Sequence, residues 1–563
     1  MDHMETMRKK ADERSDIAII GMSCLFPGAP NLEAFWRNIV RKVDATSDPP
    51  PEAWDVDTFY DPESKANDRV YCKRGGFIAP IAYFDPMDNG VMPRAVEGGE
   101  PDQWLALRVA REAFADAGYP EAIPERRSTA VILGKGTYLN RGSLTVVQHG
   151  RMVDQTIEIL ETLHPEFSAG EIAEIRADLK RKMPPFNADT APGLIPNIIA
   201  GRIANRLDLM GPNYTVDAAC ASSLIAVEHA IRGLRSREFD LALAGGVHVA
   251  TPVPTLMLFC QLGALSRREE IRPFDALADG TVLGGGLGMI VLKRLEDAER
   301  DGNRIYATVK SVGVSSDGRG LGVMAPRPEG EELALRRAYE AAGVAPETVG
   351  LIEAHGTGTP VGDATEVQAL TSVFGKRGDS LPWCGLGSIK SMIGHAMPAA
   401  GIAGIIKTAL ALYHRVLPPT LNVERPNPKL GLEASPFYLN TETRPWIHGN
   451  AETPRRGGVN AFGFGGINAH ALLEEAHAPS DSLMPWDSEV LILTGRTRDE
   501  LLGRARELEA RTEAMGDFEL RDLAASINVS SGEGRRVSRS SPPTSTIFGR
   551  SSASPARDSR TPR

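Results

Sequence analysis

The chain has 563 residues, a formal net charge of −10, 42% apolar residues and 24% charged residues. This length exceeds a single simple core and predicts a large compound domain or two to three domains. The charge gives no sign of a nucleic-acid partner, no apolar run approaches the ~20 residues of a membrane span, and the charged N-terminus does not resemble a signal peptide. The five cysteines show no paired or metal-like spacing, which predicts a reducing, cytoplasmic location without disulfides.

Strands and helices alternate through the first half of the chain. After a polar lead-in at 1–15, a buried strand is expected at 16–21, and Asn31 is placed to cap a helix ending at Val40. A Pro-, Asp- and Gly-rich surface excursion spans 44–100. The next expected elements are a helix at 103–117, a strand at 129–136, an insertion at 150–185 with a charged helix at 168–183 (Ser168 and Glu171 fit a capping box), a helix at 192–209 and a strand at 241–247.

The alternation then repeats in the second half. Strands are expected at 287–294, 307–314, 350–354 and 384–389, and helices at 332–342, 363–374 and 399–414. Two successive runs of this kind predict two layered α/β halves. The chain has no short-period repeat, so a duplication rests on the order of elements alone.

The composition changes after residue 476. A linker at 478–485 is followed by a predicted strand at 490–493 and a charged helix at 498–515. From about residue 530 the chain is dominated by Ser, Arg, Pro and Gly, which predicts disorder. Because the preceding strand and helix have no partner element, we expect a truncated or frame-altered end of a longer multidomain protein.

A cysteine lies where a buried strand is expected to turn into a buried helix. Residues 214–216 favour a strand, and the apolar positions after Cys220 recur at helical spacing (Leu224, Val227, Ile231 and Leu234). The unsatisfied N–H groups and positive dipole of a helix start favour a thiolate, which predicts a pKa below the ordinary value of about 8.5. A lone cysteine is more often a small core residue, so other motifs must decide between the two interpretations.

Two histidines each follow a predicted strand, at the edge where α/β folds bind ligands. His355 lies in Glu-Ala-His-Gly-Thr-Gly-Thr and His395 in Ser-Ile-Lys-Ser-Met-Ile-Gly-His. A third motif, Asn-Ala-Phe-Gly-Phe464-Gly-Gly, has glycines that let backbone N–H groups approach a ligand closely. One cysteine and two histidines form a nucleophile–imidazole set. A zinc site is disfavoured, because the spacing gives no metal signature and a fourth ligand is missing.

These motifs, in this order, resemble the ketosynthase (β-ketoacyl–acyl carrier protein synthase) domain of type I polyketide and fatty acid synthases, from about residue 15 to residue 476. The resemblance implies an α/β chain with the thiolase fold, a five-layered α/β/α/β/α arrangement of two similar halves, in a homodimer. It divides the chain into the lead-in (1–15), an N-terminal half with Cys220 (16–262), a C-terminal half with His355 and His395 (263–476), the start of a linker to an acyltransferase domain (477–529), and a disordered, truncated tail (530–563).

The resemblance also implies an acyltransferase that performs decarboxylative Claisen condensation in polyketide or fatty acid biosynthesis. Cys220 would carry the acyl chain, and His355 and His395 would stabilise the enolate formed from malonyl–acyl carrier protein. Backbone N–H groups of Cys220 and Phe464 would form the oxyanion hole, and Phe464 would also gate the acyl pocket.

Other residues of the same motifs are implied to support this chemistry. Lys390 and Glu366 would set the electrostatics, and Thr357 and Thr359 would contact the phosphopantetheine arm of the carrier protein. The implied partners are acyl carrier protein and its acyl and malonyl thioesters, with no metal and no cofactor bound by the chain itself.

The sequence also departs from parts of the family pattern. Cysteine instead of glutamine at position 220 argues against a decarboxylase-only loading domain, and the presence of both histidines argues against an inactive copy. Gly284-Gly285-Gly286 stands where many relatives have Gly-acid-Gly, which leaves the packing of this loop open. The segment at 272–275, Arg-Pro-Phe-Asp, is more similar to iterative polyunsaturated-fatty-acid and glycolipid-type synthases.

Two other classes of function remain open from sequence. One is a non-catalytic dimerisation scaffold that sets chain length, and the other is a Cys–His thioester hydrolase. Acyl length, starter unit and product do not follow from the sequence.

Overall fold

The computed structural model describes residues 16–97, 99–249, 251–320, 322–448, 453–476 and 497–514, with isolated positions at 491, 493, 495, 523, 524 and 527. The chain divides into two compact units, Met1–His477 and Ala478–Arg563. The lead-in at 1–15 and the tail at 530–563 lie outside the described residues. So does most of the strand predicted at 490–493, whose described positions 491 and 493 are not in a strand. The charged helix predicted next is α17 (Arg498–Ala514).

Eleven strands of the first unit form one mixed sheet, in the order β10-β8-β7-β12-β13-β6-β1-β5-β4-β2-β3. Their bounds are β1 (Ile17–Leu25), β2 (Thr129–Lys135), β3 (Asn213–Val216), β4 (Leu241–His248), β5 (Gly286–Arg294), β6 (Ala307–Ser316), β7 (Leu351–Glu353), β8 (Cys384–Gly387), β10 (Phe437–Leu439), β12 (Arg456–Gly463) and β13 (Ile467–Glu474). The short strands β9 (Val416–Leu417) and β11 (Arg444–Pro445) form a separate pair.

The two halves of the large sheet have the same topology. Numbered along the chain within each half, the strands β1 to β5 lie in the order 3-2-4-5-1, and so do β6, β7, β8, β12 and β13. In both halves the second strand pairs parallel with the third and fourth, and the fifth pairs antiparallel with the fourth and first. Antiparallel pairing of β1 with β6 joins the halves. The duplication predicted from element order is therefore present in the topology.

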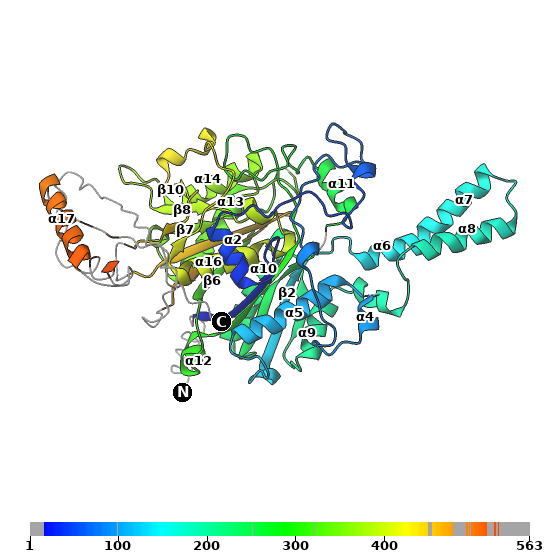
Figure 1. Cartoon of the computed structure of the whole chain (residues 1–563), viewed down its shortest axis with the longest axis horizontal. Coiled ribbons are helices and arrows are strands. Elements are labelled where there is room, and N and C mark those ends of the chain that lie inside the picture. Colours follow the sequence, from blue (N-terminus) through cyan, green and yellow to red (C-terminus); the bar gives the residue numbers. More distant parts are fainter. Residues whose placement is uncertain are drawn as a thin grey trace, which may run out of the picture. The chain divides into compact units, whose positions relative to one another are not determined.

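The helices form three layers, one between the two half-sheets and one on the outer face of each (Figure 1). Central helices α10 (Ser222–Arg235) and α16 (Ala400–His414) share one core with strands of both halves. Helices α5 (Pro101–Asp116) and α9 (Ile198–Arg206) cover the outer face of the first half, and α13 (Pro328–Ala342) and α14 (Pro360–Phe374) cover the second. The predicted five-layered α/β/α/β/α arrangement is confirmed.

Two glycines let helix α16 pack closely against helix α10 and against strand β12. A Cβ atom on Gly401 would lie 2.8 Å from Cγ of Leu224, and one on Gly404 would lie 2.8 Å from Cγ1 of Val459 in β12. Both distances are too short for carbon atoms, so only glycine fits. Helix α16 is buried along almost its whole length, which explains why its apolar residues extend beyond a single stripe.

Most predicted elements agree with the structure, and the predicted helix caps are confirmed. Asn31 caps α2 (Leu32–Val40) by accepting a hydrogen bond from the backbone N–H of Ala34 at 2.9 Å. Ser168 and Glu171 form both hydrogen bonds of the capping box before α8 (Ala169–Lys182). Each cap satisfies N–H groups that a helix start leaves free.

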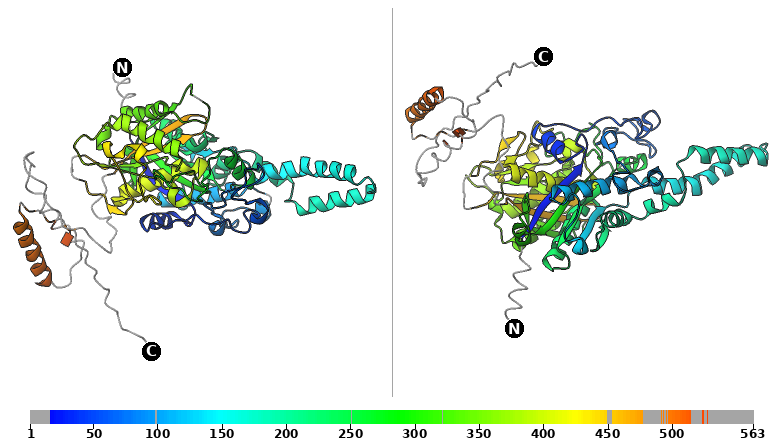
Figure 2. Two further views of the ribbon diagram at one scale, coloured as in Figure 1. Left: turned by 90° about the horizontal axis from the view of Figure 1, so that it is seen from above. Right: turned by 60° about the horizontal axis from the view of Figure 1, so that its bottom comes forward.

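Two predictions were wrong in their extent. The helix predicted at 192–209 begins only at Ile198, after two prolines that interrupt the helical hydrogen bonding. The insertion is longer than predicted, because α6 (Arg141–Val147), a π-helical turn (Gln148–Met152) and α7 (Val153–Leu163) precede α8 and form a projecting hairpin with it (Figures 1 and 2).

The excursion at 44–100 is not confined to the surface. It contains α3 (Val56–Phe59) and α4 (Pro93–Glu97), and its residues 70–72 are buried against α11 (Val253–Gln261), a helix that was not predicted. Strands β12 and β13, which contribute two central strands of the second half, were not predicted either.

The loop at 284–286 requires its glycines. A Cβ atom would lie 2.4 Å from the carbonyl oxygen of Ile393 at Gly284, 2.5 Å from that of Val249 at Gly285, and 2.3 Å from the ring of Phe26 at Gly286. The loop is therefore tightly packed at all three positions, which answers the question that the sequence left open.

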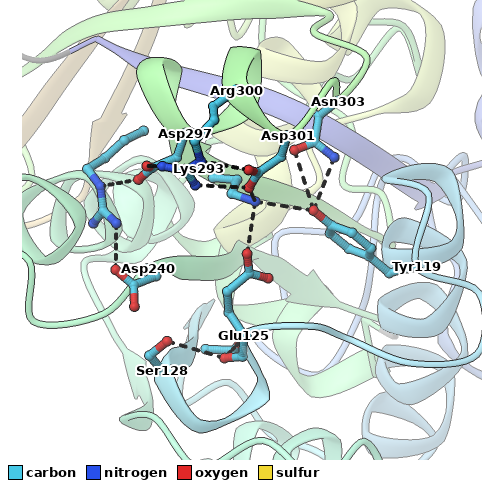
Figure 3. A network of polar contacts seen from close by, with 11 residues as sticks. Tyr119, Glu125, Ser128, Asp240, Lys293, Asp297, Arg300, Asp301 and Asn303 are labelled. Carbon is cyan, nitrogen blue, oxygen red and sulfur yellow. Dashed lines mark hydrogen bonds and ion pairs between the residues drawn. The ribbon is translucent and has the colours of Figure 1, made fainter.

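A buried lysine near the end of strand β5 lies at the centre of a polar network (Figure 3). The side chain of Lys293, in β5, is 2% exposed, and its Nζ atom lies 2.9 Å from Glu125 and 2.6 Å from Asp301. Arg300, in α12 (Leu295–Arg300), pairs with Asp301 from the surface, where its own side chain is 64% exposed. The two cations share a partner but differ strongly in burial.

We predict that Lys293→Met destabilises the first unit by about 3 kcal/mol, because it leaves two partly buried carboxylates without their cation. Arg300→Ala is the matched control and should change stability by no more than about 1 kcal/mol, as is usual for exposed ion pairs. Urea unfolding followed by tryptophan fluorescence measures both. Equal effects of the two substitutions would show that the burial of Lys293 is unimportant.

Candidate active site

Cys220 lies in a sharp turn between a strand and a helix, as predicted. The helical turn Ala219–Ala221 connects β3 to α10, and Ala219 adopts the left-handed conformation with φ of 48°. Two side chains stabilise this strained backbone. Asp217 Oδ1 accepts a hydrogen bond from the N–H of Ala219 at 3.0 Å, and the hydroxyl of Ser222 donates to its carbonyl oxygen at 2.6 Å. The turn fixes the sulfur at the start of α10.

The sulfur faces a cavity of about 410 Å³ whose walls come from both halves of the fold. Seven of the eight residues predicted for the site line this cavity, namely Cys220, His355, Thr357, Thr359, Glu366, His395 and Phe464. The eighth, Lys390, is buried outside the cavity wall at the first position of α15 (Lys390–Ile393). Segments more than 200 residues apart therefore meet at one place.

The two imidazole rings lie against each other, that of His355 just after β7 and that of His395 just after α15, the short helix that follows β8. Their centroids are 5.4 Å apart with the planes at 83°. The Nδ1 atom of His395 accepts a hydrogen bond from the N–H of Met397 at 3.1 Å, so its proton is on Nε2. His355 is held through its backbone, whose N–H donates to Oε1 of Glu366 at 2.7 Å. Its Nδ1 atom has no partner among the described residues.

Burial determines the charge of both histidines. It is the largest cause that lowers their pKa values well below 6.5, and the neighbouring cation of Lys390 acts in the same direction. Both rings are therefore neutral, and each carries one N–H donor.

The pKa predicted for Cys220 was wrong for the resting chain. Burial raises the pKa of its thiol to about 11, although Lys390 and hydrogen bonds from the backbone N–H groups of Phe464 and Cys220 itself lower it. The sulfur is 4% exposed, so desolvation outweighs the helix start. The same two N–H groups are those predicted for the oxyanion hole, and both reach the sulfur.

Two buried lysines and one buried glutamate lie outside the cavity wall, close to Glu366, which lines the cavity. Lys407 pairs with Glu353 at 2.5 Å, and burial lowers the pKa of Lys390, which faces both Glu353 and Glu366. Glu366 accepts three hydrogen bonds, from the N–H groups of His355 and Gly356 and from the side chain of Asn460. This carboxyl group thus connects α14 to the end of β7 and to β12.

The mouth of the cavity is formed by a glycine-rich turn and a pair of threonines. Phe464 lies in the tight turn between β12 and β13, is 39% exposed, and packs 5.9 Å from the ring of Phe259 in α11. Gly465 and Gly466 have φ values of 91° and 74°, which only glycine adopts readily. The hydroxyls of Thr357 and Thr359 lie 3.0 Å apart.

Sequence reasoning missed three carboxyl groups of the cavity wall, those of Asp317, Glu331 and Asp363. Asp363 accepts hydrogen bonds from the N–H groups of Gly358 (3.1 Å) and Phe274 (2.7 Å), and burial raises its pKa to about 7. It lies four residues after the motif that contains His355 and was not assigned a role. Glu331, in α13, also lines the cavity. No motif marks it, because it belongs to an ordinary charged helix.

Two further findings concern the described part of the chain as a whole. It contains no helix long and apolar enough to cross a membrane. Within the same residues, no group of three or more His, Cys, Asp or Glu side chains could hold a metal ion.

Comparisons with known proteins agree on one family. Residues 14–298 match the beta-ketoacyl synthase N-terminal domain, residues 306–424 its C-terminal domain, and residues 426–537 the ketoacyl-synthetase C-terminal extension. A polyunsaturated fatty acid synthase polypeptide of a Thraustochytrium species is 38% identical over 86% of this chain and 17% of its own length. Polyketide synthase PksL of Bacillus subtilis is 35% identical over 91% of this chain and 10% of its own. The chain thus spans only a small part of these relatives.

Solved structures lead to the same family. The ketosynthase from module 6 of the bacillaene synthase of Bacillus subtilis superposes with a TM-score of 0.69 at 33% identity, over 91% of this chain and 80% of that one. An oxazolomycin ketosynthase domain of Streptomyces albus gives a TM-score of 0.70 at 32% identity, over 91% and 84% of the two chains. These likenesses confirm the predicted thiolase fold and the resemblance to ketosynthase domains. The chain belongs to the beta-ketoacyl synthase family.

Proposed function

We propose that the chain catalyses decarboxylative condensation of an acyl group held on Cys220 with a malonyl group held on acyl carrier protein. One observation carries the proposal. A single cavity brings the Cys220 sulfur together with two neutral imidazoles and the backbone N–H groups of Cys220 and Phe464. The reaction needs a nucleophile that is also a leaving group, and it needs donors aimed at developing negative charge.

In the first step the Cys220 thiol loses its proton and attacks the thioester of an acyl–acyl carrier protein. The carrier thiol leaves and takes up a proton. The N–H groups of Cys220 and Phe464, which hydrogen-bond the sulfur in the resting chain, turn to the carbonyl oxygen when it becomes an oxyanion. Loss of one such donor typically lowers the rate by about 10²–10³.

In the second step malonyl–acyl carrier protein loses CO₂, and the electron pair of the broken bond forms an enolate. His355 and His395 donate hydrogen bonds to the enolate oxygen. Neutral donors suit this task, because they stabilise the charge without binding the anionic substrate as an ion pair. The enolate carbon then attacks the acyl carbonyl, and the Cys220 thiolate leaves and takes up one proton.

The rest of the proposal concerns partners and location. Thr357 and Thr359 at the mouth would contact the phosphopantetheine arm, Phe464 would gate the acyl pocket, and Lys390 and Glu366 would set the electrostatics.

We also propose a homodimer, since β3 ends the sheet and its outer edge has no strand partner among the described residues. The proposal further includes a cytoplasmic location. The products would be polyketides, fatty acids or polyunsaturated fatty acids, since the relatives include polyketide and polyunsaturated fatty acid synthases.

Replacing the nucleophile tests the two steps separately. We expect Cys220→Ala to abolish both acylation and condensation, because no sulfur remains. Cys220→Gln should abolish condensation but retain malonyl decarboxylation, since both histidines stay in place. The assay supplies an acyl-pantetheine thioester and malonyl–acyl carrier protein, and mass spectrometry follows the Cys220 peptide, the CO₂ balance and the 3-ketoacyl product.

Each alternative function predicts a different outcome of this assay. A non-catalytic scaffold leaves Cys220 of the unmodified chain without an acyl group. A thioester hydrolase forms the adduct but releases only free acid, with no 3-ketoacyl product. Loss of decarboxylation in Cys220→Gln would count against the roles of His355 and His395.

The raised pKa of Cys220 predicts how alkylation depends on pH. A thiol with a pKa of about 11 is mostly protonated at neutral pH. The rate of Cys220 alkylation by iodoacetamide should therefore rise about tenfold per pH unit, without a plateau below pH ~10. Lys390→Met should raise the pKa further and slow alkylation at pH 7.5, because it removes the cation that favours the thiolate.

Peptide mapping would separate Cys220 from the other cysteines in this experiment. Lys182→Met is the control, since the Lys182 side chain is 74% exposed on the projecting hairpin. It should leave the alkylation rate unchanged. A plateau below pH 8.5 would show that the helix start, not burial, dominates the thiol.

A further inference from the structure

One carboxyl group in the wall of the active-site cavity has an oxygen atom that forms no hydrogen bond with any described residue. Glu331 is only 2% exposed and lines the same cavity as Cys220, His355 and His395. Its Oε2 atom is buried without a hydrogen-bond partner among the described residues. A buried polar atom without a partner is costly, so such an atom on a residue that lines a cavity points to a ligand.

The start of α13, which carries Glu331, packs close to the turn that holds Phe464. A Cβ atom on the preceding Gly330 would lie 2.0 Å from Oδ1 of Asp317 and 2.8 Å from the side-chain nitrogen of Asn468. Asp317 also packs against Gly466, the last glycine of the turn. The start of α13 is therefore fixed tightly against this wall, and Glu331 cannot move away from it at low cost.

The charged groups that face Glu331 are both acidic. They are Glu366 of α14 and Asp317 at the end of β6, and with burial they raise the pKa of Glu331 well above its ordinary value. Glu366 already accepts three hydrogen bonds and Asp317 accepts one from Asn468. Burial and these two neighbouring carboxyl groups therefore favour the protonated form of Glu331. A protonated carboxyl has one O–H donor, and the Oε2 atom of Glu331 has no hydrogen-bond partner among the described residues.

The proposed reaction leaves one substrate group without a partner. The N–H groups of Cys220 and Phe464 serve the acyl carbonyl, and the two histidines serve the malonyl thioester. The malonyl carboxylate still needs a donor, yet none of the described residues that line the cavity is Lys or Arg. A neutral donor can orient this carboxylate without the strong stabilisation by a cation that would oppose loss of CO₂.

We propose that the carboxyl group of Glu331 donates a hydrogen bond to the carboxylate of a malonyl-type extender and so positions it for decarboxylation. This inference rests on the proposed condensation function. It makes Glu331 a substrate-binding residue for the extender alone, with no part in loading Cys220.

Two substitutions of similar size separate this role from simple packing. Glu331→Gln keeps a neutral donor, and Glu331→Met keeps the length but removes the donor. The measurement is single-turnover condensation by chain already acylated on Cys220, with the malonyl–acyl carrier protein concentration varied. We expect Glu331→Met to lose about ten- to hundredfold in kcat/KM for the extender, as for a hydrogen bond to a charged group, and Glu331→Gln to stay within about threefold.

Two further readouts complete the test. Acylation of Cys220 should be unchanged in both variants. On the alkaline side, extender use by the unmodified chain should fall as Glu331 ionises, because a second anion then faces the carboxylate, and Glu331→Gln should lack this fall. Thr281→Val serves as a comparison, since the Thr281 hydroxyl also lines the cavity without a partner.

The proposal is overturned if Glu331→Met condenses at the normal rate, if Glu331→Gln is impaired as much as Glu331→Met, or if Thr281→Val alone reproduces the loss. Equal loss of acylation and condensation in Glu331→Met would indicate a structural role and would also overturn it. Failure of the unmodified chain to acylate Cys220 would instead refute the condensation function itself.

Discussion

Burial of the side chains around the active-site cavity is the main influence on the charge of its catalytic groups. Burial lowers the pKa values of His355 and His395 and raises those of Cys220 and Glu366. In water these imidazoles would be partly cationic near neutral pH. Here they are neutral donors, which is the state that enolate stabilisation requires. The same burial leaves Cys220 a thiol at rest, so the sulfur becomes a nucleophile only when its proton is removed during acylation.

The buried lysines Lys390 and Lys407 lie outside the cavity wall, and the described residues that line the cavity include no Lys or Arg. Lys407 is neutralised by Glu353, and Lys390 lies close enough to Cys220 to lower its pKa without lining the cavity. A lysine inside the cavity would form an ion pair with a malonyl carboxylate and hold it in the ground state. A lysine one layer away stabilises the thiolate over a longer distance. This arrangement explains how one site can favour both a sulfur anion and the loss of a carboxylate.

Local chemistry in the sequence predicts the elements and the main site residues well. Helix caps such as Asn31 depend on neighbouring residues only, and a histidine that follows a buried strand must lie at the sheet edge. Strand β12 was missed because Gly457, Gly458 and Gly463 suppress the usual strand signal. These glycines are required by tertiary contacts, as at Gly458, where a Cβ atom would lie 2.5 Å from the ring of His470. The pKa of Cys220 and the isolation of Glu331 depend on burial, which sequence does not report.

The duplicated topology explains why the nucleophile and a histidine face each other. Cys220 follows β3, the third strand of the first half, and His395 follows β8, the third strand of the second. Each precedes the central helix of its own half, α10 or α16, and these helices pack together near their N-termini. The turn that holds Cys220 also contacts the turn after His395 (Met397–Ala399). Corresponding strand-to-helix segments of two similar halves are thus brought together by the pairing of the halves, and one segment carries a sulfur where the other carries an imidazole.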